Sequence, residues 1–211
     1  MNLMEKLNSN FKENKLFYLL VLTFFFVGIL LGAYTIKYMD GVDAKDLSDY
    51  FTGFLQTIST KEVATKDLLL NVLTKNIFFI LLIIALGFTT FGAPIILLID
   101  LIKGFTLGYT FSFLLTTFEG EGIWVALVTT IPQNILYIPS FVGISIISLD
   151  MSLLKMKEKF FNGSRMNKAM LKRNVVKFGI FLIIFVIGVI IESYVSPGLI
   201  RLVVTKAYKL T

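Results

Sequence analysis

The stretch GFTTFGAPIILLIDLIKGFTLGYTFSFLL, residues 87–115, decides the fold. It is apolar enough to lie in a lipid bilayer, yet it contains glycines, a proline and two charged residues of opposite sign. Because proline removes a backbone donor and disfavours helix in the preceding residue, Gly92-Ala93-Pro94 predicts an interruption of the helix. Two interpretations are open: a hairpin of two membrane spans with a polar turn, or a broken or re-entrant element over residues 92–104. The second needs a cover of protein or a cavity, because irregular backbone does not face lipid.

Residue spacing in the same stretch indicates how its helices pack. Asp100 and Lys103 are three residues apart, so on a helix they share a face and can form an ion pair. Gly104 and Gly108 form a G-x-x-x-G pattern, which lets two membrane helices approach closely. We therefore expect this stretch to lie against other helices rather than only against lipid.

Hydropathy predicts an integral membrane protein. Of the 211 residues, 56% are hydrophobic. Several apolar runs approach the roughly 20 residues that a helix needs to cross a bilayer. We predict an all-α fold, a single polytopic membrane helix bundle over residues 1–211, with about five spans at residues 16–36, 77–92, 94–118, 124–149 and 178–196. Span two could instead reach Ile99, with span three beginning at Gly104. Span one repeats the G-x-x-x-G spacing at Gly28 and Gly32, either as a packing contact or by chance.

The absence of cysteine and histidine limits the kinds of catalytic and metal site that the chain can form. The sequence contains neither residue, so it excludes disulfides, cysteine nucleophiles, Ser-His dyads and sites with Cys or His metal ligands. An intramembrane aspartyl protease needs two facing aspartates, and the apolar spans offer only Asp100. We expect no cofactor, no metal and no catalytic residue, so the protein is not predicted to be an enzyme.

The distribution of charge predicts the orientation. Residues 150–177 contain eight Lys or Arg and two acidic residues, an excess that equals the net charge of +6 for the whole chain. Basic loops concentrate on the cytoplasmic side, so we predict a basic cytoplasmic helical hairpin there, against the anionic lipids of the inner leaflet and not against nucleic acid. The N-terminus is then cytoplasmic, and residues 37–76, residues 119–122 and the C-terminus are external.

The external loop 37–76 contains an amphipathic helix near residues 44–59. Its apolar residues follow helical spacing and form one stripe: Leu47, Tyr50, Phe51, Phe54, Leu55 and Ile58. Such a stripe must be buried against something. The bundle, the membrane surface and a partner protein are all open, and we treat the stripe as a candidate docking surface.

Two further groups of polar residues lie inside predicted spans. Pro132, Gln133 and Asn134 fall within span four, and Glu192 lies near the outer end of span five. Amide and carboxyl groups are costly against lipid, so these side chains point inward. They serve either interhelical hydrogen bonds or a pathway for a substrate or ion.

The order of these motifs resembles the stage II sporulation protein M family over roughly residues 1–200. The similar features are a glycine in the second span, the run from Pro94 to Gly108, a Gly-x-Gly turn, Pro132–Asn134 in the next span, and the segment from Glu192 to Pro197. Each motif is short, and the resemblance rests on their order and spacing together.

This resemblance implies a multipass protein of the mother-cell and septal membrane during sporulation. It implies a non-enzymatic scaffold for engulfment, which anchors and localises the septal peptidoglycan hydrolases, stage II sporulation proteins D and P. The alternative is a small transporter or channel that uses the buried polar residues of the broken helices. Whether copies of the chain form a homo-oligomer is open.

Overall fold

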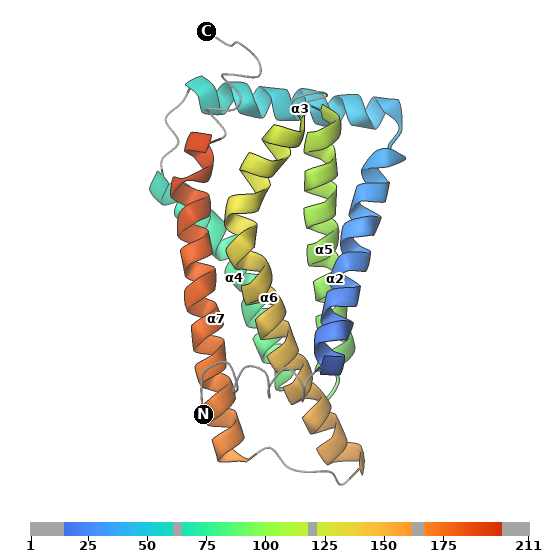
Figure 1. Ribbon diagram of the computed structural model, residues 1–211, viewed down its shortest axis with the longest axis vertical. Helices are drawn as coiled ribbons and strands as arrows, with labels where there is room; N and C mark the ends of the chain where they lie inside the picture. Colours follow the sequence, from blue (N-terminus) through green and yellow to red (C-terminus); the bar gives the residue numbers. More distant parts are fainter. Residues whose placement is uncertain (1–14, 61–64, 118–121, 162–166, 200–211) are drawn as a thin grey trace.

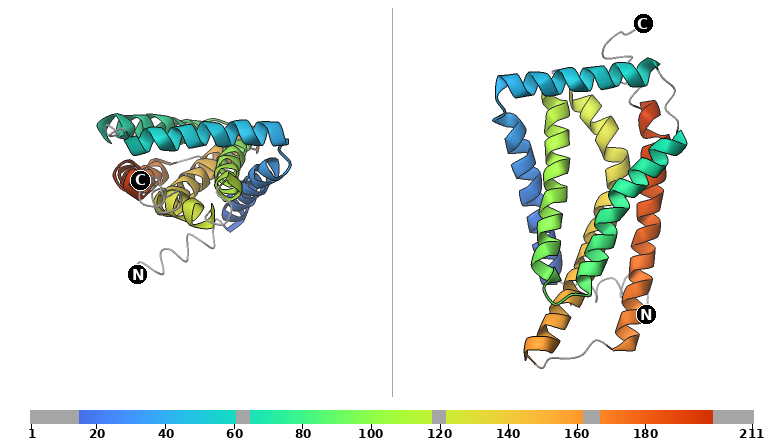
Figure 2. Two further views of the ribbon diagram at one scale, coloured as in Figure 1. Left: turned by 90° about the horizontal axis from the view of Figure 1, so that it is seen from above. Right: turned by 180° about the vertical axis from the view of Figure 1, so that it is seen from behind.

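The computed structural model describes residues 15–60, 65–117, 122–161 and 167–199. These residues form the helices α2 (Lys15–Lys37), α3 (Gly41–Thr60), α4 (Thr65–Gly87), α5 (Gly92–Thr117), α6 (Gly122–Phe161) and α7 (Lys168–Tyr194). Five of them, all except α3, are long and apolar enough to cross a membrane. They lie along the long axis of the molecule, and α3 lies across one end (Figures 1 and 2). The predicted all-α bundle with five spans is confirmed.

The hairpin interpretation of residues 87–115 is correct, and the broken or re-entrant element over residues 92–104 was wrong. Helix α4 ends at Gly87, and α5 runs without interruption from Gly92 to Thr117. Pro94 lies in the first turn of α5, where its missing N–H has no helical acceptor to lose. A Cβ atom at Gly92 would lie 2.0 Å from the carbonyl oxygen of Leu86. The glycine therefore permits the tight turn, and the proline follows it at a tolerated position.

The second span begins earlier than its hydropathy suggested. Helix α4 starts at Thr65 rather than at residue 77, so its first three turns contain polar residues, including Lys66 and Asp67. Asp67 lies in the first turn, where a negative charge interacts favourably with the helix dipole. The segment between the first two spans is therefore shorter than the predicted loop 37–76.

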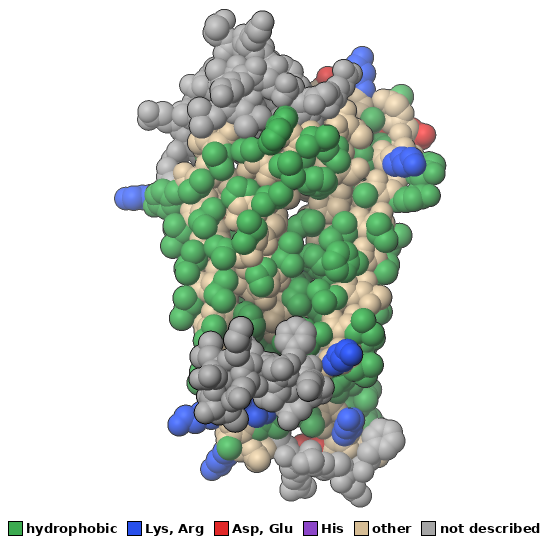
Figure 3. Space-filling view, viewed as in Figure 1, with side chains coloured by type: hydrophobic (Ala, Val, Ile, Leu, Met, Phe, Trp, Pro, Cys, Tyr) green, Lys and Arg blue, Asp and Glu red, His purple; other side chains and the backbone are tan. Residues whose placement is uncertain are grey.

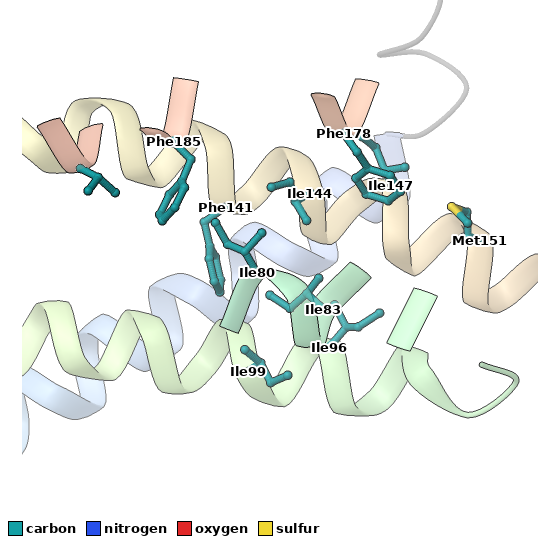
Figure 4. Packing of buried hydrophobic residues seen from close by; sticks show 11 residues of the cluster. Ile80, Ile83, Ile96, Ile99, Phe141, Ile144, Ile147, Met151, Phe178 and Phe185 are labelled. Atoms are coloured by element: carbon teal, nitrogen blue, oxygen red, sulfur yellow. The ribbon is translucent and has the colours of Figure 1, made fainter. Parts of the chain in front are cut away.

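Helix α6 is the central element of the bundle. In its spanning window 67% of the residues are buried, against 28% or less in the other four spanning helices. Every residue from Phe141 to Leu149 is buried. The largest buried cluster surrounds this stretch with side chains from four helices: Ile80, Ile83, Ile96, Ile99, Phe141, Ile144, Ile147, Met151, Phe178, Phe185 and Val189 (Figure 4).

The outer surface of the bundle is apolar along its middle. Leu30 of α2, Ile135 of α6 and Ile183 of α7 are each more than 60% exposed. Figure 3 shows hydrophobic side chains over the middle of the molecule, with Lys and Arg toward both ends. A contiguous apolar band of this kind fits the hydrocarbon of a bilayer, because soluble monomers rarely expose large apolar patches.

The fold predicts that the two ends of the bundle lie on opposite sides of the membrane, whichever end faces the cytoplasm. The end of the bundle that carries α3 and the end where α7 begins are opposite (Figure 1). Asp43 and Lys168 are exposed at these two ends. Because the chain contains no cysteine, Asp43→Cys and Lys168→Cys can each be labelled alone in sealed vesicles. We expect an impermeant maleimide to label only one of them before the vesicles are opened. Equal labelling of both from the same side would contradict five spans.

Candidate functional site

Helices α2 and α5 touch backbone to backbone at their glycines. A Cβ atom at Gly28 of α2 would lie 2.1 Å from the carbonyl oxygen of Leu101. One at Gly32 would lie 2.1 Å from the carbonyl oxygen of Phe105. Real Cβ atoms do not approach oxygen so closely, so only glycine fits at either position. The G-x-x-x-G pattern of the first span is therefore a packing contact and not a chance spacing.

The glycines of α5 in turn lie against the backbone of α2. A Cβ atom at Gly104 would lie 2.0 Å from the carbonyl oxygen of Phe25, and one at Gly108 would lie 2.1 Å from that of Ile29. The contacts advance together along both sequences, so α2 and α5 are a parallel pair. Small residues of this spacing allow such close approach of membrane helices.

Asp100 lies on the same face of α5 as these glycines but contacts α6. Its side chain is 0% exposed. The hydroxyl of Ser145 donates a hydrogen bond to Asp100 Oδ1 at 2.6 Å. A carboxyl group this deep in a membrane protein is costly unless it has partners, and it marks a candidate functional position.

Lys103 does not pair with Asp100, so the ion pair expected from their spacing was wrong. Its ammonium group donates to Asn76 Oδ1 of α4 at 3.3 Å. The same Nζ lies 4.3 Å from the ring centroid of Phe79 and 5.9 Å from that of Phe141. Aromatic faces attract a cation, and more strongly where water is excluded. Lys103 thus finds its partners on α4 and α6.

Glu192 is the acidic partner that Lys103 lacks on its own helix. The two side chains attract one another electrostatically between α5 and α7. Tyr137 of α6 donates a hydrogen bond from its hydroxyl to Glu192 Oε2 at 2.6 Å. Gly188, one turn before Glu192, makes room for the Tyr137 ring, because a Cβ atom there would lie 2.9 Å from two ring carbons.

These side chains form separate interhelical contacts: Asp100 with Ser145 joins α5 to α6, Lys103 with Asn76 joins α5 to α4, and Tyr137 with Glu192 joins α6 to α7. We call Asn76, Asp100, Lys103, Tyr137, Ser145 and Glu192 the polar network. Three of its members, Asp100, Lys103 and Glu192, can carry a charge at neutral pH. Unpaired charges are expensive at this depth, so the network fixes how the four helices fit together.

The polar residues of span four make local contacts. Gln133 donates to the carbonyl oxygen of Thr129, and Asn134 donates to that of Thr130 at 2.7 Å. Gln133 also accepts a hydrogen bond from Ser196 Oγ at 3.3 Å. Pro132 and Pro139 lie inside α6, where proline removes one hydrogen bond of the helix and bends it. These residues lie at the same end of the bundle as Glu192 but do not bond to the polar network.

Ser152 of α6 holds the turn between α4 and α5. The backbone N–H of Ala93 donates to Ser152 Oγ at 2.9 Å. The same hydroxyl donates to the carbonyl oxygen of Thr89 at 2.9 Å. One side chain thus satisfies a buried N–H at the start of α5, which would otherwise lack a partner, and also bonds to a carbonyl of the turn.

Sequence reasoning missed the partner residues Asn76, Tyr137, Ser145 and Ser152. Asn76 fell just before the predicted start of span two, and serine and tyrosine are common in apolar helices. The available signal was the spacing of Ser145 and Ser152, seven residues apart, which places both on one face of α6. That face is directed toward the α4–α5 hairpin.

Helix α3 extends over residues 41–60, close to the predicted range 44–59. Leu47 is partly buried and packs against the cluster of Ile36, Phe113, Leu114 and Ala126. Tyr50 is 77% exposed. The side chains of Phe51, Phe54, Leu55 and Ile58, like residues 119–121, lie outside the described part of the structure.

Comparison with known protein families gives a match to this chain. A family model described as Stage II sporulation protein M matches residues 21–197, well over half of the chain. The chain belongs to the stage II sporulation protein M family. No curated protein and no solved structure matches it. This family member is therefore a sporulation-related multipass membrane protein, and the matched region includes the α2–α5 contact and all of the polar network.

The α2–α5 contact predicts strong effects at its glycines. Replacing Gly104 or Gly108 by leucine forces side-chain atoms into the backbone of α2, and overpacking of this kind costs about 1–3 kcal/mol or more. We expect both variants to lose membrane accumulation and detergent resistance. Gly179→Leu on α7 is the matched control, because nothing lies within 4 Å of a Cβ atom there. Equal accumulation of all three variants would contradict the contact.

The attraction between Lys103 and Glu192 predicts a coupled pair. Removing either charge leaves the other without its electrostatic counterpart inside an apolar bundle, which is destabilising. We expect Lys103→Met and Glu192→Gln each to lower the unfolding temperature in detergent, and the double variant to recover part of the loss. Strictly additive losses in this cycle would show that the two groups do not interact.

Proposed function

We propose that this protein is a membrane scaffold of the engulfment machinery. In this proposal it anchors the septal peptidoglycan hydrolases, stage II sporulation proteins D and P, in the mother-cell membrane. The observation that carries the proposal is the family match over residues 21–197, which spans every membrane helix. The partners follow from the family resemblance of the sequence motifs.

The proposed orientation places the α6–α7 end in the cytoplasm. The ends of these helices carry most of the basic residues of the described chain: Lys155, Lys157, Lys159, Lys168, Lys172, Arg173 and Lys177. Asp150 and Glu158 are the acidic residues of the same region. Basic residues favour the cytoplasmic side, so α3 faces the cell exterior in this proposal.

Helix α3 is the proposed docking element for the hydrolases. One part of it is fixed to the bundle, since Leu47 packs beside Ile36 and Phe113. Val42 is 73% exposed and Tyr50 is 77% exposed. Exposed apolar and aromatic side chains on an anchored helix suit recognition by an anchored partner.

We propose that the hydrolytic activity belongs to the partners. The acidic residues Asp43, Asp46 and Asp49 are all exposed on α3. Glycan cleavage by paired carboxylates needs separations of about 5–10 Å held in a rigid cleft. A solvated helix surface does not hold carboxylates in that way.

A small transporter or channel is the second candidate, and the polar network favours it. Asp100, Lys103 and Glu192 lie inside the bundle, as in proteins that move ions or protons. Their hydrogen bonds with Ser145, Asn76 and Tyr137, however, serve helix packing equally well. Flux of protons or small ions in liposomes that the Lys103→Met variant abolishes would favour transport over scaffolding.

The scaffold proposal is tested by placing charges on the stripe of α3. The double variant Phe51→Asp, Leu55→Lys should still insert in the membrane, but the two hydrolases should no longer concentrate at the septum. The matched control is Thr52→Asp, Gln56→Lys, which places the same charges at the same spacing on the opposite face of the helix. Fluorescent fusions of the hydrolases in sporulating cells provide the measurement. Septal localisation in both double variants would place the docking surface elsewhere.

A further inference from the structure

Two buried polar atoms without a hydrogen-bond partner lie in the same interface. Among the described residues, Asp100 Oδ2 and Ser148 Oγ are fully buried and unpaired. Asp100 faces Ser145 of α6, and Ser148 lies one turn further along α6. Ser148 is close against α4, since a Cβ atom at Gly87 would lie 2.9 Å from it. Both atoms therefore lie between α6 and the α4–α5 hairpin.

Three serines lie along α6 between the level of Asp100 and the turn of that hairpin. Ser145, Ser148 and Ser152, which we call the serine seam, have spacings of three and four residues and share a face of α6. All three are 0% exposed. Ser145 bonds to Asp100, and Ser152 bonds to the turn at Thr89 and Ala93. The seam places the unpaired hydroxyl of Ser148 between the hydroxyl that bonds the turn and the one that bonds the carboxyl group.

Among the residues that the structure describes, no cation forms an ion pair with Asp100. On its own helix, Lys103 is directed to Asn76 of α4 and to the ring of Phe79. From α7, Glu192 accepts from Tyr137 of α6 and attracts Lys103. Helix α2 has no charged residue between Lys15 and Lys37.

An ionised carboxyl group would be poorly stabilised in this position. It would have one hydrogen bond, from Ser145, and one bare oxygen in an apolar interior. Such a charge costs far more to bury than a neutral carboxylic acid, which has a proton on one oxygen. The hydroxyl of that acid could donate a hydrogen bond, which a carboxylate cannot do.

We propose that Asp100 is an intramembrane proton-binding site that exchanges its proton with water at the α4–α5 turn along the serine seam. The carboxylate takes up one proton to become a carboxylic acid, and no bond other than O–H forms or breaks. Loss of the proton leaves a bare carboxylate between α6 and the hairpin. Binding of the proton at Asp100 thereby stabilises the packing of α6 against the hairpin. This proposal does not depend on the scaffold function.

Infrared spectroscopy of the full chain in lipid nanodiscs tests the bound proton. We expect the carbonyl band of a protonated carboxylic acid at neutral pH, and its loss in Asp100→Asn. Asp67→Asn, which removes an exposed carboxyl group, should leave the band unchanged. If Asp100→Asn does not fold, Ser145→Ala replaces it, because losing the hydrogen bond to Oδ1 shifts the same band. A spectrum without a band that responds to either variant would overturn the proposal.

Transfer of the same samples to heavy water tests the route. Deuterium exchange shifts the carboxylic acid band, and we expect this shift to be slower in Ser148→Ala than in the unmodified protein. Ser140→Ala is the matched control, because Ser140 is also fully buried on α6 but bonds to the carbonyl oxygen of Leu136. Equal exchange rates in all three proteins would contradict exchange along the seam.

Discussion

The contact of four glycines between α2 and α5 is the constraint on which the rest of the bundle depends. Apolar side chains gain little by leaving lipid for another helix, so close backbone packing must hold membrane helices together. Here the glycines bring carbonyl oxygens of one helix onto the Cα atoms of the other. Because the two helices are parallel, the chain between them must return across the membrane. Helix α3 crosses the end of the bundle and α4 makes that return (Figure 2).

The polar network adds specificity to this packing. Helix α6 lies between the α4–α5 hairpin and α7, and it supplies a partner to each: Ser145 to Asp100, and Tyr137 to Glu192. A rotation of any of these helices would leave a polar group facing hydrocarbon, which is costly. The same groups that fix the arrangement are those that can bind a proton. Structural and chemical roles therefore coincide at Asp100.

The sequence predicts the number of spans and the inward direction of the polar residues, because both follow from hydropathy and length. It also marks Gly104 and Gly108 as packing residues, but it cannot show that they pack against Phe25 and Ile29 of α2, since spacing does not identify a neighbouring helix. Pro94 was misjudged because a proline in a first turn and one in mid-helix look alike until the end of the preceding helix is known. Lys103 illustrates the same limit. Its spacing suggested a pair with Asp100, whereas in the fold it contacts Asn76 and two aromatic rings.

Disulfide cross-linking between α2 and α5 tests the central contact most directly, because G-x-x-x-G patterns can also join separate chains. Ser112 Oγ lies 3.5 Å from the carbonyl oxygen of Ala33, and the chain has no other cysteines to interfere. Oxidation of the Ala33→Cys, Ser112→Cys variant should give a cross-link within one chain. Leu30→Cys with Ser112→Cys should give none, since Leu30 is 67% exposed. Cross-linked dimers in place of the internal bond would show that the glycines join two copies and would contradict the account.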